Sequence, residues 1–211
     1  MSCIDDKIAA ETARAKADER MNTLILATEA ARVPPTMSPE TIYVAPLSLV
    51  EATVADAKVS HLVTLINGDT AIPTPSGIGP ERHLRLGMND ICEPQPGLVL
   101  PCVNHVDDLI SFTREWDRQA PLLIHCWAGI SRSTAAAYIA LCALNREGTE
   151  HELAWALRRA SPTAYPNRLL VALADQALAR DGRMIAAVED IGRGQIAEEA
   201  DVFALRALLA A

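Results

Sequence analysis

The sequence contains few lysines and no long apolar run, and each absence excludes a class of protein. Only three of the 211 residues are lysine, the net charge is −8 and the isoelectric point is near 5.1. Such an acidic chain offers no basic cluster for nucleic acid or for an anionic membrane surface. No apolar run reaches the roughly 18 residues of a membrane span, and the first residues lack the basic and apolar stretches of a secretory signal. We therefore expect a cytoplasmic enzyme that binds neither nucleic acid nor membrane.

Closely spaced cysteine pairs are also missing. The five cysteines are odd in number and widely separated: Cys3, Cys92, Cys102, Cys126 and Cys142. Neither a disulfide framework nor a zinc site is expected from this spacing. A chain of this kind is typical of a reduced compartment, in which a cysteine thiolate can act as a nucleophile.

The length is sufficient for one well-buried domain with extensions. Residues 3–32 are rich in Ala, Glu, Arg and Lys and contain no Pro or Gly, which predicts a helix. The Pro34-Pro35 pair and Pro39 then mark a boundary. The predicted organisation is a helical N-terminal extension, one catalytic domain and a helical C-terminal tail, over residues 1–39, 40–182 and 183–211.

Short apolar runs alternate with helical patterns through the central part of the chain. This alternation predicts an α/β fold, with a central, mostly parallel sheet flanked by helices. Strands are expected at residues 42–45, 61–66, 83–86 and 121–124. Helices are expected at 48–57, capped by Ser48, and at 103–119, 131–144, 150–159 and 167–180. After the break at Gly192-Arg193-Gly194, the tail is expected to resume as a helix from Ile196.

The most informative segment is Ile-His-Cys-Trp-Ala-Gly-Ile-Ser-Arg-Ser-Thr, residues 124–134. It places Cys126 and Arg132 on a turn between a buried strand and a buried helix, where backbone N–H groups and the helix N-terminus attract an anion. Arg132 could bind two oxygens of a phosphate. The segment predicts a phosphate-binding loop whose backbone is formed by Trp127, Ala128, Gly129, Ile130, Ser131 and Arg132.

Three further residues of the segment make the pattern specific. A Cys-x5-Arg pair alone arises easily by chance, but the pair combined with His125, Gly129 and Ser133 does not. His125 is interpreted as a residue that orients the loop. Gly129 permits a backbone conformation that turns N–H groups inward. The Ser133 hydroxyl either donates to the Cys126 sulfur or caps the helix.

The full set resembles the cysteine-dependent protein tyrosine phosphatase superfamily, with its signature His-Cys-x5-Arg-Ser/Thr. The run from Ala128 to Ser133 is most similar to the dual-specificity branch, as is Tyr165-Pro166-Asn167 at the start of a helix. The resemblance covers roughly residues 40–180 and implies a phosphatase fold. It also implies a general acid on a separate loop, a position that Asp90 matches.

Three other aspartates, Asp107, Asp108 and Asp117, compete with Asp90 for the role of general acid, but they lie on a predicted helix, where a solvated face explains them. The mechanism implied by the resemblance is hydrolysis of a phosphomonoester through a phosphocysteine on Cys126. Asp90 would protonate the leaving oxygen and then activate water. No metal or other cofactor is required, because Arg132 and the loop amides supply the positive field.

Some alternatives remain open from the sequence. The chain is either an enzyme that acts on a phosphorylated protein or small phosphomonoester, or a catalytically weak phosphate-binding module. A sulfur-transferring domain of the rhodanese type also places a cysteine loop after a strand, but it does not explain Ser133 or Asp90. Trp127 either lines the rim of the site or packs beneath it, and Cys92 either has a redox role or is a packed loop residue. The loop has no lysine, which favours protein phosphotyrosine or small phosphomonoesters over lipid substrates, and the oligomeric state is left open.

Overall fold

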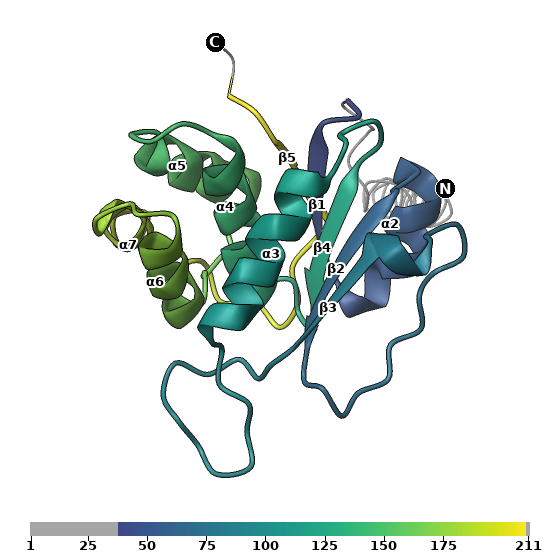
Figure 1. The fold of residues 1–211 in the computed structure, drawn as a ribbon, viewed down its shortest axis with the longest axis horizontal. Helices are drawn as coiled ribbons and strands as arrows, with labels where there is room; N and C mark the ends of the chain where they lie inside the picture. Colours follow the sequence, from purple (N-terminus) through teal and green to yellow (C-terminus); the bar gives the residue numbers. More distant parts are fainter. Residues whose placement is uncertain (1–37, 210–211) are drawn as a thin grey trace, which may run out of the picture. The chain divides into compact units, whose positions relative to one another are not determined.

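A computed structural model describes residues 38–209 and folds them around one five-stranded sheet (Figure 1). The predicted N-terminal helix at 3–32 lies outside the described residues. The strands are β1 (Thr41–Pro46), β2 (His61–Ile66), β3 (His83–Gly87), β4 (Leu122–Cys126) and β5 (Phe203–Arg206). The α-helices are α2 (Val50–Ala57), α3 (Val103–Glu115), α4 (Arg132–Leu144), α5 (Glu150–Ala160), α6 (Arg168–Ala177) and α7 (Arg183–Asp190). Two 3-10 turns, η1 (Leu47–Leu49) and η2 (Pro80–Arg82), complete the set.

The sheet has the strand order β3-β2-β4-β1-β5. Its first four strands are parallel, and β5 is antiparallel to β1. β4 lies at the centre, and all five of its residues are buried, as expected for an apolar strand covered on both faces. The prediction of an α/β fold with a mostly parallel sheet flanked by helices is confirmed.

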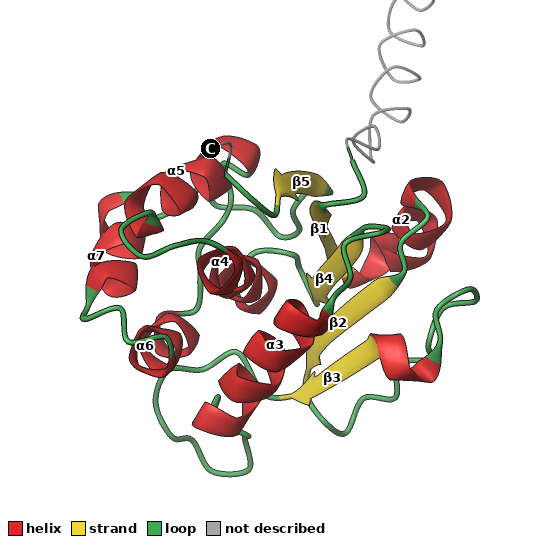
Figure 2. Cartoon of the chain, turned by 45° about the horizontal axis from the view of Figure 1, so that its top comes forward, coloured by secondary structure: helices red, strands yellow, loops and turns green. Residues whose placement is uncertain are grey.

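Helix α4 forms the centre of the larger helical layer. It packs against strands β1 and β4 and against helices α3, α5 and α6, and Figure 2 shows these helices on one side of the sheet and α2 on the other. Every residue from Arg132 to Cys142 is buried. Four of them are alanines, whose small side chains allow close packing on several sides. The N-terminal end of α4 is therefore held rigidly beside the end of β4.

Three predicted helix boundaries are wrong. The helix predicted at 167–180 ends at Ala177, and the other two differ for local reasons. Ser48 does not cap a helix: it lies in η1, and its Oγ donates to Glu199 Oε1 at 2.6 Å. The helix predicted at 103–119 ends at Glu115, because Trp116 adopts an extended backbone with ψ 119°. The Trp116 indole is buried and donates to the Ala120 carbonyl at 2.9 Å. Burial of this large side chain outweighs continuation of the helix.

The C-terminal tail also differs from its prediction. Residues 183–190 form α7, but the helix expected from Ile196 is wrong, since no helix follows α7 within the described residues and residues 203–206 form β5. Phe203 and Leu205 are buried, whereas Arg206, at the end of the strand, is exposed, a pattern that suits a strand at the edge of a sheet. β5 thereby pairs with the outer edge of β1, so the tail is built into the fold.

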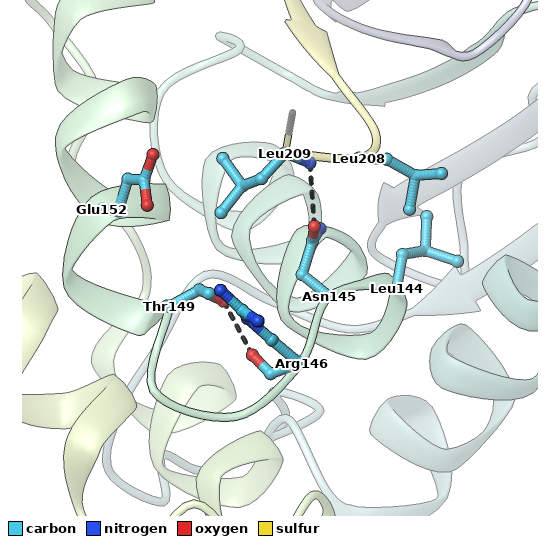
Figure 3. Close-up of a pocket in the computed structure, with 7 residues that line it drawn as sticks. All are labelled: Leu144, Asn145, Arg146, Thr149, Glu152, Leu208 and Leu209. Carbon is cyan, nitrogen blue, oxygen red and sulfur yellow. Dashed lines mark hydrogen bonds between the residues drawn. The ribbon is translucent and has the colours of Figure 1, made fainter. Parts of the chain in front are cut away.

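The Asn145 side chain, just after α4, hydrogen-bonds the backbone of the segment that follows β5. Its side chain donates to the Ala207 carbonyl at 2.8 Å and accepts from the Leu209 N–H at 2.9 Å. A pocket of about 420 Å³ lies beside it, between the end of α4 and residues 208–209 (Figure 3). Because α4 separates this pocket from the loop that precedes the helix, the two are about 20 Å apart. None of the helices within residues 38–209 has both the length and the apolar character needed to cross a membrane.

Candidate active site

The predicted phosphate-binding loop, residues 127–132, runs from the end of β4 into the first residue of α4. Cys126 is the last residue of β4 and Arg132 is the first residue of α4. The loop therefore lies at the carboxyl edge of the parallel strands, where open α/β sheets form their binding sites. It also lies at the N-terminus of a buried helix, which favours an anion.

The loop carbonyls are turned outward by hydrogen bonds from three distant segments. The carbonyl oxygens of Trp127, Ala128 and Ile130 accept from the N–H groups of Leu47 at 3.0 Å, Ala200 at 2.8 Å and Tyr165 at 2.9 Å, respectively. The N–H groups of residues 127–131 have no acceptor among residues 38–209. The backbone thus presents a ring of donors that matches the needs of a phosphate.

Gly129 makes this backbone conformation possible. Its φ is +73°, in the left-handed region, and a Cβ placed on it would lie 2.9 Å from the Pro46 nitrogen and 3.1 Å from the Ala45 carbonyl carbon. Any other residue would be strained and would also collide with the end of β1. The loop can pass this close to the sheet only with glycine at this position.

Cys126 and Ser133 meet inside the loop. The Cys126 side chain is 2% exposed, and its Sγ lies 3.1 Å from the Ser133 Oγ. Because Ser133 is fully buried, its hydroxyl is held in place next to the sulfur. The predicted cap role of Ser133 does not apply, since Ser131 occupies the N-cap position of α4.

Arg132 is buried, and part of its guanidinium makes no hydrogen bond within the described residues. Its Nη1 donates to the Met88 carbonyl at 2.8 Å, whereas the buried Nε has no hydrogen-bond acceptor among the described residues. A buried charged donor without a hydrogen-bond acceptor is costly. The edge formed by Nε and the second Nη suits the bidentate binding of a phosphate.

Asp90 lies on the loop after β3 and reaches the same site. Its Oδ1 accepts from Ser131 Oγ and from Asn167 Nδ2, each at 2.8 Å. Its Oδ2 lies 3.9 Å from Arg132 Nε and accepts no hydrogen bond from a described residue. The competing aspartates 107, 108 and 117 make no hydrogen bond or ion pair with the loop within residues 38–209.

Asn167 was not predicted as a functional residue, although it connects three parts of the site. Its side-chain oxygen caps α6 by accepting from Leu169 N and Leu170 N, each at 3.1 Å. Its Nδ2 donates to Asp90, and its backbone N–H points to the Ser131 carbonyl at 3.4 Å. The Pro-Asn pair before the helix signals the cap, but the contact with Asp90 spans 77 residues and has no local signal.

His125 lies beneath the loop and is fully buried. Its Nδ1 faces the Cys126 carbonyl at 3.4 Å, and its Nε2 is 2.7 Å from Thr64 Oγ1 on β2. Burial lowers the pKa of His125 from 6.5 to about 4, so the ring is neutral at pH 7. This environment agrees with its interpretation as an orienting residue.

Trp127 lies on the surface of the site and not beneath the loop. The side chain is 46% exposed, and its Nε1 donates to Asn67 Oδ1 at 3.0 Å. Cys92 is also exposed, and its Sγ lies 3.8 Å from Asn167 Oδ1. A redox role for Cys92 stays a hypothesis.

Comparisons with known proteins give matches at the level of structure. No protein-family model and no curated protein sequence matches the chain. Human DUSP28 is 18% identical over 74% of this chain and 98% of its own, with a TM-score of 0.47. A mouse protein named as a dual specificity phosphatase, complexed with zinc tungstate, is 17% identical over 74% of this chain and 96% of its own, with a TM-score of 0.48.

A third solved structure is OH1 from the Orf virus, a tyrosine phosphatase with triple substrate specificity. It is 16% identical over 75% of this chain and 85% of its own, with a TM-score of 0.35. These three solved structures are named as phosphatases of the dual-specificity or tyrosine type.

Proposed function

We propose that this protein is a cysteine-dependent phosphatase, of the tyrosine or dual-specificity type, that hydrolyses phosphomonoesters through a phosphocysteine. The observation that carries the proposal is the convergence of four features around the loop between β4 and α4. These are the Cys126 sulfur beside the Ser133 hydroxyl, the Arg132 Nε that has no hydrogen-bond acceptor among the described residues, the loop N–H groups that likewise have none, and the Asp90 carboxyl. Together they provide a nucleophile, an oxyanion site and an acid.

In the first step, the Cys126 thiolate attacks phosphorus and the bond to the leaving oxygen breaks. Asp90 is the acid, and Oδ2 is the oxygen that carries the proton, since Oδ1 is occupied by two donors. Protonation prevents an alkoxide or phenoxide from leaving as an anion. Arg132 and the loop amides stabilise the equatorial oxygens while the phosphoryl group moves.

In the second step, water attacks the phosphocysteine and the sulfur–phosphorus bond breaks. Asp90, now ionised, accepts a proton from the water and returns to its starting form. The departing sulfur becomes a thiolate, which accepts a hydrogen bond from Ser133 Oγ. The products are inorganic phosphate and the free enzyme.

The surface of the site favours phosphotyrosine or a small aryl phosphate as the substrate. The exposed indole of Trp127 lies at the first position of the loop and offers an apolar face for an aromatic leaving group. Residues 127–131 contain no lysine, and the chain carries a net charge of −8, so a phosphoinositide surface is a poor match. A phosphorylated protein in the cytoplasm is the proposed natural substrate.

A catalytically weak phosphate-binding module is the competing function, because it also needs Arg132 and the loop amides. Only an enzyme needs Cys126 and Asp90. Hydrolysis of p-nitrophenyl phosphate separates the two. We expect turnover by the wild type, no detectable turnover by Cys126→Ser, and a fall of about 10²- to 10⁴-fold for Asp90→Asn.

Asp107→Asn serves as the matched control, since it removes a carboxylate of the same kind that does not contact the loop. Its activity should equal that of the wild type. Equal turnover by the wild type and Cys126→Ser would contradict the mechanism. Tight phosphate binding without turnover by the wild type would favour the binding module.

A further inference from the structure

A row of buried and half-buried side chains connects the nucleophile loop to the far side of β3. Thr64 Oγ1 lies 2.7 Å from His125 Nε2 and 2.8 Å from His83 Nε2. The opposite nitrogen of His83, Nδ1, lies 2.9 Å from Thr74 Oγ1, and Arg85 Nη2 donates to that same hydroxyl at 2.7 Å. With the contact between His125 Nδ1 and the Cys126 carbonyl, the row is continuous from the exposed cation of Arg85 to the backbone of Cys126.

We infer that these residues form a hydrogen-bond chain with a single direction, from Arg85 through Thr74, His83, Thr64 and His125 to the Cys126 carbonyl. In this chain, called the β3–β4 chain below, each member donates to the next. Thr64 and His83 are then positioning residues for the nucleophile, although neither touches the loop.

The direction follows from the two ends of the β3–β4 chain. A guanidinium can only donate and a carbonyl can only accept. If His125 donates from Nδ1 to the Cys126 carbonyl, a neutral ring leaves Nε2 as an acceptor, and the Thr64 hydroxyl must donate to it. The Thr64 oxygen then accepts from His83 Nε2–H, which leaves His83 Nδ1 to accept from Thr74. The Thr74 oxygen is thereby free to accept from Arg85.

The opposite direction leaves groups unsatisfied. It would place the lone pair of His125 Nδ1 against the Cys126 carbonyl oxygen, so that two acceptors face each other in a fully buried position. Buried polar groups without partners are unfavourable, so the direction toward Cys126 is preferred.

Both imidazole rings are in the charge state that the β3–β4 chain requires. Burial, with the nearby cation of Arg85, lowers the pKa of His83 from 6.5 to about 4. Burial also lowers the pKa of His125 to about 4. Neutral rings have one donor and one acceptor each, whereas two imidazolium rings would both donate to the same Thr64 oxygen.

The β3–β4 chain contacts the Cys126 peptide through its carbonyl, whereas the loop N–H groups are the donors proposed to bind phosphate. Thr64 lies directly opposite His125 in the register of β2 and β4, and Arg85 lies opposite Thr64 in the register of β3 and β2. The sheet itself therefore fixes the spacing of its members. The expected effect of the β3–β4 chain on kcat rests on the proposed phosphatase function. The direction of the hydrogen bonds in the β3–β4 chain does not.

The direct test is the tautomeric state of both rings in the wild-type protein, measured by ¹⁵N NMR of the imidazole nitrogens at pH 7. We expect His125 to be protonated at Nδ1 and bare at Nε2, and His83 to be protonated at Nε2 and bare at Nδ1. A proton on His125 Nε2, or a doubly protonated ring at either position, would overturn the inference. This measurement needs no variant and no catalytic activity.

Variants of His83 test the positioning role. His83→Leu removes the donor to Thr64, and we expect kcat to fall about fivefold, the rate equivalent of one hydrogen bond, with KM within about twofold. His83→Gln places an amide donor near the former Nε2 and should restore kcat to within about twofold. His61→Gln, on the same edge of the sheet but outside the β3–β4 chain, is the matched control and should equal the wild type.

The result for His83→Leu also has a spectroscopic readout. The His125 ¹⁵N shifts should move toward the other tautomer or toward a mixture, since nothing then fixes the Thr64 hydroxyl. Unchanged kcat together with unchanged His125 shifts would overturn the positioning role. A wild type with the expected tautomers but no turnover would refute the proposed function and leave the direction of the β3–β4 chain standing.

Discussion

Gly129 is the residue at which one additional carbon would disturb the site most. Gly129→Ala places a Cβ at a φ of +73° and 2.9 Å from the Pro46 nitrogen. We expect the free energy of unfolding to fall by about 2 kcal/mol or more, from strain and the collision together. Phosphatase activity should be lost, because the loop must move away from β1. Urea unfolding and p-nitrophenyl phosphate hydrolysis measure the two effects.

Gly148→Ala is the control for Gly129→Ala, because it separates strain from collision. Gly148 has a φ of +87°, but its added Cβ would meet nothing within 4 Å. Its substitution should cost only the backbone strain, about 1 kcal/mol, and leave activity unchanged. Equal stability and equal activity of the two variants would show that the approach to β1 is unimportant.

The residues of the site differ in how far the sequence could predict them. Cys126, Arg132 and Ser133 lie within eight consecutive positions, which span the loop and the start of the next helix. Their spacing in the sequence is therefore enough to predict that they lie close together. Thr64 and His83 lie on other strands, and only the register of the sheet brings them to His125. The neighbouring sequence does not distinguish a strand threonine that hydrogen-bonds a histidine from a strand threonine that only packs against its neighbours.

At the scale of elements, the site depends on how α6 and the loop after β3 are joined. Asn167 makes this connection by capping α6 and donating to Asp90. Asn167→Asp keeps the cap, since Asp and Asn are equivalent at an N-cap. It removes the donor and places a second carboxylate beside Asp90. We therefore expect kcat to fall about tenfold or more with little loss of stability.

Asn167→Ala is the companion variant. It loses both the cap and the donor, so kcat should fall and the free energy of unfolding should drop by about 1 kcal/mol. Stopped assays and urea titrations of both variants give the comparison. If Asn167→Asp retained full activity, the contact with Asp90 would not position the acid.

The elements that the sequence predicted correctly are those whose signal is local. The strand at 61–66 and the helix at 150–159 match β2 and α5 within one residue. β5 could not be predicted, because four residues carry a weak pattern and their pairing partner, β1, lies about 160 positions earlier. The end of α3 depended on the tertiary burial of Trp116, which helix propensity does not reveal.

At the scale of the whole molecule, two buried neutral histidines make stability depend on pH. The pKa of His83 and that of His125 are each lowered from 6.5 to about 4 in the folded state. Between these values the unfolded chain binds protons that the folded protein does not. Stability should therefore be constant above pH 6.5 with respect to these groups and fall as the pH drops toward about 4.

Each histidine can contribute a slope of up to about 1.4 kcal/mol per pH unit in that range. Urea unfolding of the wild type and of His83→Gln, from about pH 7.5 to about pH 5, measures the slope. We expect a shallower dependence in the variant, because one of the two groups is removed. Identical slopes would show that folding does not lower the pKa of His83.

The phosphoryl group itself offers the most direct test of the proposed function. The wild type and Ser133→Ala are mixed with p-nitrophenyl phosphate, quenched in acid within the first turnover and digested for mass spectrometry. We expect one phosphoryl group on the peptide that contains Cys126, in greater amount in Ser133→Ala, since loss of the hydroxyl slows release of the sulfur. Turnover with the phosphoryl group absent from Cys126, or attached to another residue, would contradict the two-step mechanism.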